Sequence, residues 1–413
     1  MKIYDDLPIR LLKATPLPEA SLSVRPFDVR AITDTIQRAL ASAGLDTQAG
    51  PMKGVTDTIQ QALSAAGLNQ RAAVPSQHGA TIEGVAREIG TPHDSTDGAP
   101  IGPIAPAEPA YPGEFVSRSF TNSAGTRTYK LYVPASYSGE WDEPVPMVVM
   151  LHGCTQSPDD FAAGTRMNAI AEQHGFLVVY PAQAANANGS KCWNWFRSED
   201  QSRDHGEPSL IAGITREVAS NYRVDKRRIF VAGLSAGAAM AVILGATYPE
   251  LYAAVGAHSG LPYGAARDMP SAFGAMKGGG AVASIPNLPA TPMARRPQAE
   301  HGVPTIVFHG DRDHTVDARN GAAIVEQATV GRSDEPRLRA SVHEGAASGG
   351  RTYSRTVYAD AGNRPVVEQW VLHGAGHAWS GGSPRGSFTD ACGPDASAEM
   401  IRFFYSQQRA GTA

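Results

Sequence analysis

The sequence predicts an α/β fold built on a mostly parallel sheet with helices on both faces. Strand-like and helix-like stretches alternate from about Phe115 onward, which is typical of a parallel sheet covered on both sides. The strand-like stretches are continuous apolar runs, as expected of strands that are buried on both faces. The 413 residues, 42% of them hydrophobic and 18% charged, are enough for one large globular domain with additional segments.

Most of the predicted strands are short runs of apolar residues. They cover residues 128–133, 147–151, 176–180, 228–232, 252–257, 305–309 and 368–372. Helical stretches lie among them or follow the last one, at residues 209–222, 236–247, 318–327 and 396–407. Residues 262–297 are rich in Gly, Ala and Pro, so we expect a short irregular lid there.

Residues 1–110 differ in composition from residues 111–413, and we interpret them as an N-terminal extension of a catalytic domain. The segments 34–45 and 57–68 are near repeats, each opening on Asp with Gln three residues later and ending near Gly, which predicts two short helices. We expect them to dock on each other or on the catalytic domain, or to stay partly unfolded, because such short helices are marginal alone. The alternative is an adaptor for an apolar partner. The composition of residues 71–110 predicts a flexible linker.

Charge and hydropathy exclude several classes of partner. The formal net charge is -4 with acids and bases mixed along the chain, so no basic stripe indicates nucleic acid. No apolar run reaches the roughly 18 to 20 residues that a membrane span needs. Charged residues and Pro8 interrupt the apolar stretch that a secretory signal would require at the start of this sequence. We therefore expect a cytoplasmic protein.

The three cysteines are Cys154, Cys192 and Cys392. An odd and low count does not predict a scaffold held by disulfides, so we expect three buried or half-buried thiols. The alternative is a Cys154–Cys192 bridge, because both residues lie in predicted loops that the fold could bring together. The sequence does not decide between them.

A G-x-S-x-G motif spans residues 233–237, directly after the predicted strand 228–232 and before the predicted helix 236–247. This is the context of a nucleophile elbow, a sharp turn in which bulky residues at the glycine positions would collide with their neighbours. The turn places Ser235 at a helix N-terminus, where the partial positive charge favours a developing anion. The motif predicts an α/β-hydrolase fold with Ser235 as the nucleophile.

A serine nucleophile needs a base and an acid that orients the base, and in this fold they follow in the order acid, then histidine. Asp313 lies after the predicted strand 305–309 and is our candidate acid, with Asp311 and then Asp317 as alternatives. His377 follows the last predicted strand and is our candidate base. His373 is the competitor, and we expect it to hold the loop by a hydrogen bond.

The spacing of His373 and His377 would suit a zinc site if both lay on a helix. Two glycines between them argue against a helix, and no nearby acid completes a ligand set. The sequence therefore indicates neither a metal nor an organic cofactor.

The predicted oxyanion hole consists of two backbone N–H groups. One follows the nucleophile and belongs to Ala236, and the other comes from the loop after the strand 147–151, where Cys154 is our candidate. We expect His152 to brace that loop rather than to act in catalysis.

Three tryptophans are candidates for substrate contacts. Trp193 and Trp195 lie together in a loop, and Trp379 follows the candidate base by two residues. Aromatic faces suit an acyl chain, a polyester segment or an aromatic acid. For the loop pair, the alternative is packing in the core.

Together these motifs resemble the esterase family of polyhydroxybutyrate depolymerases, whose relatives include feruloyl and acetylxylan esterases. The matching stretches are LHGCTQSPDDFA, CWNWF, VAGLSAGAAMA, HGDRDHTV and HGAGHAWSGG, spread in order over residues 129–404. The resemblance implies a polyester or short acyl ester as substrate and a Ser–Asp–His triad, which falls on Ser235, Asp313 and His377.

The resemblance leaves three function classes open. The first is hydrolysis of polyhydroxyalkanoate polymer or oligomers, the second is a feruloyl or acetylxylan esterase, and the third is a non-catalytic granule-surface or interaction protein. The sequence shows no export signal or polymer-binding module, which secreted members of the family carry. We therefore expect a cytoplasmic enzyme, with secretion as the alternative. Contact of the N-terminal helices with polymer granules is a hypothesis that their apolar faces suggest.

Overall fold

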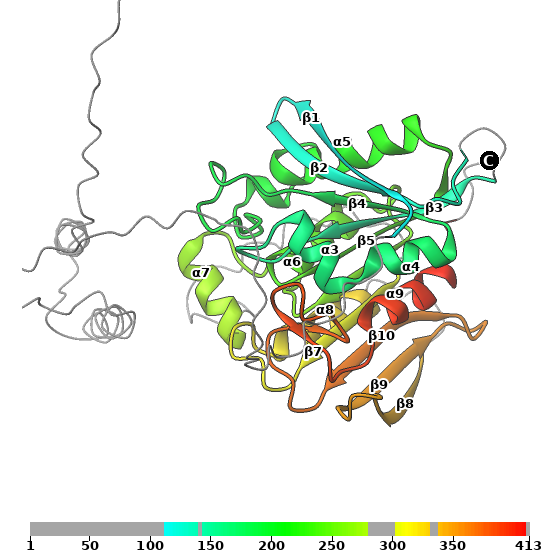
Figure 1. Ribbon diagram of the computed structural model, residues 1–413. Helices are drawn as coiled ribbons and strands as arrows, with labels where there is room; N and C mark the ends of the chain where they lie inside the picture. Colours follow the sequence, from blue (N-terminus) through cyan, green and yellow to red (C-terminus); the bar gives the residue numbers. More distant parts are fainter. Residues whose placement is uncertain (1–110, 139–142, 280–301, 331–337, 410–413) are drawn as a thin grey trace, which may run out of the picture. The chain divides into compact units, whose positions relative to one another are not determined.

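The computed structural model describes residues 111–138, 143–279, 302–330 and 338–409. Within them one large sheet has ten strands in the order β1-β2-β4-β3-β5-β6-β7-β10-β9-β8 (Figure 1). Six central strands pair in parallel, namely β4, β3, β5, β6, β7 and β10. The strands at the two ends of the sheet, β1 and β2 on one side and β9 and β8 on the other, pair antiparallel. The predicted mostly parallel sheet is confirmed.

The bounds of the strands follow the apolar runs of the sequence in the centre of the sheet. The strands are β1(Glu114–Asn122), β2(Gly125–Val133), β3(Val145–Leu151), β4(Leu177–Pro181), β5(Val224–Leu234), β6(Ala254–His258), β7(Thr305–Gly310), β8(Arg339–Ala346), β9(Thr352–Ala359) and β10(Pro365–Leu372). A separate pair of short parallel strands consists of β11(Trp379–Ser380) and β12(Thr389–Asp390).

Helices lie between most of these strands. They are α3(Pro158–Thr165), α4(Met167–His174), α5(Gly206–Asn221), α6(Ala236–Thr247), α7(Met269–Gly274), α8(Arg319–Val330) and α9(Ala396–Tyr405), with short turns η1(Glu199–Gln201) and η2(Ala275–Gly279). No helix in the described ranges is long and apolar enough to cross a membrane.

The core lies in two layers because successive strand residues point to opposite faces. On β3, Val149 and Leu151 belong to a cluster that includes residues of α5 and α6. Val148 and Met150 belong to a second cluster with residues of α3, α4 and α9. Both faces of the sheet are therefore covered, as the continuous apolar runs predict.

Strands β1, β8 and β9 and helices α3 and α4 were not predicted from the sequence. β8 is almost entirely exposed and β9 is half-buried, so neither carries the apolar run of a central strand. The predicted lid corresponds in part to α7 and η2. Residues 280–297 of this stretch, and the predicted helices at 34–45 and 57–68, lie outside the described residues.

A fully buried carboxylate, Glu368 on β10, joins three elements. It accepts hydrogen bonds from Arg355 Nε and Nη2 on β9 at 3.0 and 2.9 Å, and from Arg402 Nη2 on α9 at 2.6 Å. Burial would raise the pKa of Glu368, but the two guanidinium groups hold it below its usual value. The ion pair fastens α9 and the outer hairpin to β10.

We predict that Glu368→Gln destabilises the fold, because it leaves two guanidinium groups around a neutral amide. The free energy of unfolding in urea should fall by about 3 kcal/mol. Glu399→Gln is the matched control, since Glu399 pairs with the same Arg402 but is partly exposed, and its loss should be under about 1 kcal/mol. Equal effects of the two substitutions would contradict the role assigned to Glu368.

Candidate active site

Ser235 occupies the turn between β5 and α6. Its backbone φ of 58° and ψ of -120° lie in a region that residues other than glycine rarely adopt. Two hydrogen bonds hold the turn, because Ser235 N–H donates to the His258 carbonyl at 2.9 Å and Ala239 N–H donates to the Ser235 carbonyl at 3.0 Å. The predicted sharp strand-to-helix turn is confirmed.

The glycines of the motif are required by close backbone contacts. A Cβ at Gly237 would lie 2.1 Å from the carbonyl oxygen of Leu151, and one at Gly233 would lie 2.4 Å from the carbonyl carbon of Gly237. Both distances are too short for any side chain. The turn therefore packs directly on the end of β3, and this contact brings Ser235 next to the loop that follows β3.

The register of the sheet brings the ends of five strands to one edge. Leu151 pairs with Gly233, Leu234 pairs with His258, and His258 pairs with Phe308. Leu372 at the end of β10 pairs with Gly310 at the end of β7. Loops that are far apart in the sequence therefore start side by side, at the carboxyl ends of parallel strands where ligands bind in open α/β sheets.

Asp313 and His377 come from two of these loops and form a hydrogen bond. His377 Nδ1 lies 2.7 Å from Asp313 Oδ2. The Asp313 carboxylate is fully buried, while the His377 side chain keeps 13% exposure. The buried acid therefore fixes the ring through Nδ1, and Nε2 is left for another partner.

Further donors keep Asp313 ionised. Its Oδ1 accepts the N–H groups of Thr315 and Val316 at 2.9 and 2.8 Å, and His309 Nε2 lies 3.5 Å from Oδ2. Burial would raise the pKa of Asp313, but His309, His377 and the Val316 N–H hold it far below its usual value. A carboxylate that stays charged stabilises a positive imidazole beside it.

The alternative acids and base have other partners. His373 Nδ1 lies 3.1 Å from Asp311 Oδ2, and His373 Nε2 lies 2.8 Å from Ser354 Oγ. Asp311 Oδ1 also accepts the Gly374 N–H at 2.7 Å, so this chain of bonds fastens the start of the His377 loop. Asp317 accepts bonds from Arg319 next to it. The expectation that His373 holds the loop agrees with these contacts.

His258, a residue that the sequence analysis missed, lies between the Ser235 turn and the His377 loop. Its carbonyl accepts the Ser235 N–H, and its Nε2 accepts the Ser380 N–H at 3.0 Å. Its ring stacks on Phe308 and Trp379. The only sequence signal was a histidine at the end of a buried strand.

Within the described residues Ser235 Oγ makes no hydrogen bond to His377. Hydrogen bonds between catalytic groups are often long before substrate binds.

The loop after β3 lies against the nucleophile. A Cβ at Gly153 would be 3.6 Å from the Cβ of Ser235. The Gly153 N–H donates to Gln156 Oε1 at 2.9 Å and the Thr155 N–H donates to the Ser190 carbonyl at 2.7 Å. Among the described residues the Cys154 N–H has no acceptor, and the same holds for the Ala236 N–H. Both predicted oxyanion donors are therefore available to a ligand.

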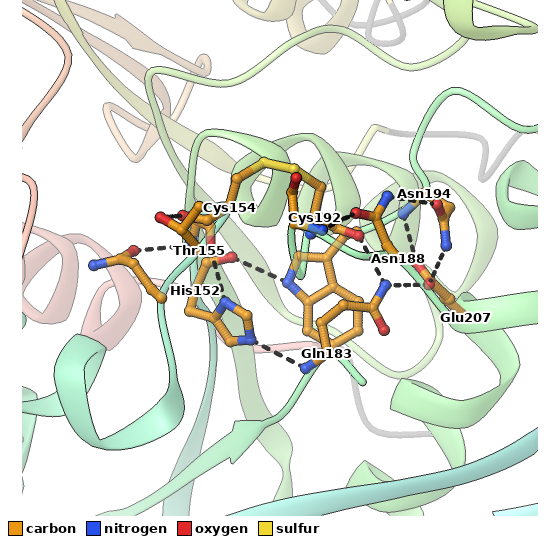
Figure 2. The surroundings of a disulfide bond; sticks show 12 residues. His152, Cys154, Thr155, Gln183, Asn188, Cys192, Asn194 and Glu207 are labelled. Carbon is orange, nitrogen blue, oxygen red and sulfur yellow. Dashed lines mark hydrogen bonds between the residues drawn. A yellow bond between two sulfur atoms is a disulfide. The ribbon is translucent and has the colours of Figure 1, made fainter. Parts of the chain in front are cut away.

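Cys154 and Cys192 form a disulfide (Figure 2). The expectation of three thiols was wrong for these two, and Cys392 is a free but exposed cysteine rather than a buried one. Residues 38 positions apart cannot be paired from sequence spacing alone, because the fold of the intervening loop brings them together. The bridge ties the loop beside the nucleophile to the loop of residues 184–196.

His152 braces the same loop, as expected. Its Nδ1–H donates to the Gly153 carbonyl at 2.7 Å, and its Nε2 accepts the Gln183 N–H at 3.0 Å (Figure 2). Burial lowers the pKa of His152 to about 4. The ring is therefore neutral near pH 7 and serves as a bridge between two backbone segments.

The three tryptophans that the sequence suggested for substrate contact are almost fully buried. Trp193 is 0% exposed and Trp379 is 1% exposed. Trp193 Nε1–H donates to the His152 carbonyl, and Trp379 Nε1–H donates to Ser397 Oγ. Trp195 is 6% exposed and packs on Phe196. These contacts favour core packing for all three side chains.

A mostly parallel sheet with a strand–turn–helix serine and an acid–histidine pair at the same edge defines the α/β-hydrolase fold class. A solved structure with this fold is the acetyl xylan esterase from Aspergillus awamori. The TM-score is 0.52 and the sequence identity is 19%, and the match covers 70% of this chain and 99% of that chain.

Residues 127–332 match the family described as Esterase PHB depolymerase, and the chain belongs to that family. It is 34% identical over 272 residues to poly(3-hydroxyalkanoate) depolymerase C of Paucimonas lemoignei, covering 63% of this chain and 60% of that protein. It is 33% identical over 147 residues to probable acetylxylan esterase A of Aspergillus fumigatus, covering 35% of this chain and 37% of that protein. The chain thus spans less than two thirds of either relative.

The buried His258 predicts a pH dependence of stability. Burial, helped by the nearby His309 and His377, lowers the pKa of His258 to about 3, whereas an unfolded histidine titrates near about 6.5. Between these values the unfolded chain binds more protons, so stability is present above pH 6.5 and declines as the pH falls.

We therefore expect the free energy of unfolding to fall less steeply from about pH 6.5 to 5 in His258→Gln than in the wild type. The difference should be on the order of 1 kcal/mol per pH unit, measured by urea unfolding. His343→Gln, which replaces an exposed histidine on β8, should keep the wild-type slope. A wild-type slope in His258→Gln would contradict the assignment of a buried neutral ring.

The disulfide predicts a second effect on stability. Closing a loop of 38 residues should stabilise the fold by about 3 to 4 kcal/mol. The double substitution Cys154→Ser and Cys192→Ser should lower the free energy of unfolding by that amount, whereas Cys392→Ser should not. Hydrogen exchange of the Gly153–Gln156 amides should also accelerate in the double variant. Unchanged exchange there would show that the bridge does not hold this loop.

Proposed function

We propose that the protein is a serine hydrolase of carboxylic esters, with Ser235 as nucleophile, His377 as general base and Asp313 as the orienting acid. The observation that carries the proposal is the 2.7 Å bond between Asp313 Oδ2 and His377 Nδ1, at the strand edge where Ser235 occupies its constrained turn. The family membership supports the same chemistry.

The proposed reaction has two halves. His377 Nε2 takes the proton of Ser235 Oγ as the oxygen attacks the ester carbonyl, and the positive imidazole is stabilised by Asp313. The Cys154 and Ala236 N–H groups donate to the oxyanion that forms. His377 then gives the proton to the leaving alcohol, which leaves an acyl group on Ser235. Water activated by the same imidazole releases the acid.

For the substrate we propose a polyhydroxyalkanoate, such as polyhydroxybutyrate, or its oligomers. The similarity to poly(3-hydroxyalkanoate) depolymerase C supports this choice over 63% of the chain. Acetylated xylan is the second candidate, supported by the similarity to probable acetylxylan esterase A. Release of hydroxybutyrate from its oligomers, compared with release of acetate from acetylxylan, separates the two.

For the location we propose an oxidising compartment rather than the cytoplasm that the sequence first indicated. The Cys154–Cys192 disulfide supports this, because disulfides rarely persist where thiols are kept reduced. Contact of the N-terminal helices with polymer granules belongs to the alternative, cytoplasmic location. It rests on residues outside the described ranges, and deleting residues 1–110 tests it. The deletion should reduce granule association and leave hydrolysis of a small soluble ester intact.

The catalytic proposal predicts that Ser235→Ala lowers kcat for p-nitrophenyl butyrate by at least about a thousandfold, because the acyl-enzyme can no longer form. Ser354→Ala is the matched control. Ser354 also bonds to a histidine that is paired with an aspartate, and its loss should change kcat by less than about tenfold. A wild-type protein without esterase activity, or the reverse ranking of the two variants, would overturn the proposal.

A further inference from the structure

Phe388 combines two features that rarely occur together. Its side chain is 47% exposed, although it is large and apolar. Its φ is 52°, in the left-handed region that costs a residue with a side chain about 1 kcal/mol or more. A strained backbone that presents an aromatic ring to solvent does not serve core packing, and such outliers cluster at functional sites.

The first anchor of Phe388 is the loop of the candidate base. The Trp379 N–H donates to the Phe388 carbonyl at 2.7 Å, and Trp379 pairs in parallel with Thr389. Neighbouring strands lie about 4.8 Å apart. The Phe388 backbone therefore runs beside Trp379, two residues after His377.

The second anchor is the loop of the candidate oxyanion hole. Gln156 Nε2 donates to the carbonyl of Ser387 at 3.1 Å, while Gln156 Oε1 accepts the Gly153 N–H. Ser387 N–H also donates to Asp160 Oδ1 at 2.9 Å, and Gln156 Nε2 donates to Asp160 Oδ2 at 2.8 Å. Phe388 is thus held between the loop of the base and the loop of the oxyanion donors.

The segment before Phe388 is tightly packed. A Cβ at Gly386 would lie 2.4 Å from the backbone of Gly164 on α3. Ser383 N–H donates to the Gly164 carbonyl at 2.8 Å, and Thr389 Oγ1–H donates to the Ser383 carbonyl at 2.9 Å. The backbone of Phe388 is therefore held in place before any ligand binds. Little conformational entropy would be lost when a ligand contacts this residue.

We infer that Phe388 is a specificity-determining residue that contacts the alcohol part of the ester. This inference rests on the proposed function. The imidazole that protonates the leaving group must lie beside the alcohol oxygen, and Phe388 is anchored on the His377 side of the site. Its ring is apolar and 47% exposed, whereas Trp193 and Trp379 are buried. The substrates favoured are esters of alcohols that carry an apolar chain.

The test compares methyl, butyl and hexyl butanoate in wild type and Phe388→Gly. Glycine adopts the left-handed backbone without strain, so the thermal midpoint should hold while the ring is removed. In wild type kcat/KM should rise with the length of the alcohol. In Phe388→Gly the ratio of kcat/KM for hexyl over methyl butanoate should fall about tenfold, mainly through KM. The ratio for methyl hexanoate over methyl butanoate should not change.

A second variant and a control complete the test. Phe388→Asn should behave like the glycine variant, because asparagine also tolerates the left-handed region. Val342→Asn removes an exposed apolar side chain, 64% exposed, from the outer strand β8 and should keep the wild-type ratio. An unchanged alcohol ratio in both Phe388 variants would overturn this inference alone. Absence of wild-type activity on every ester would instead overturn the proposed function.

Discussion

The hydrogen bond between Asp313 and His377 is the contact on which the rest of the site depends. It joins loops after β7 and β10, 64 residues apart in the sequence, and it can form only because those strands are parallel neighbours with Leu372 opposite Gly310. The fold supports it from both sides. His309 and two backbone N–H groups keep the acid charged, and Asp311 with His373 fastens the start of the base loop.

The loop after β3 depends on a different kind of support. A covalent bridge through Cys154, the neutral ring of His152 and the amide of Gln156 each fix one part of it. The Gly153 and Thr155 N–H groups donate to protein acceptors, whereas the Cys154 N–H has no acceptor among the described residues. Such preorganisation means that donors need no rearrangement when charge develops on a ligand. The same Gln156 also holds the segment that presents Phe388.

The central strands and the turn at Ser235 could be predicted because local signals agreed: apolar runs, glycines at fixed spacing and a small-residue helix. Asp313 and His377 followed from their place after strands. The disulfide, His258 and Phe388 could not be predicted, because their significance lies in pairings between distant segments and in backbone angles. The outer hairpin β8–β9 lacks a buried face. The sequence left core packing open for the tryptophans of the loop, because composition does not distinguish a buried indole from one that lines a cleft.

The most direct measurement is the site and rate of covalent labelling by a fluorophosphonate probe, mapped by mass spectrometry. We expect a single adduct on Ser235 in the wild type. Labelling should slow markedly in Asp313→Asn, because the imidazole loses the carboxylate that orients it. An adduct on another serine such as Ser354, or equal labelling rates in wild type and Asp313→Asn, would contradict the account.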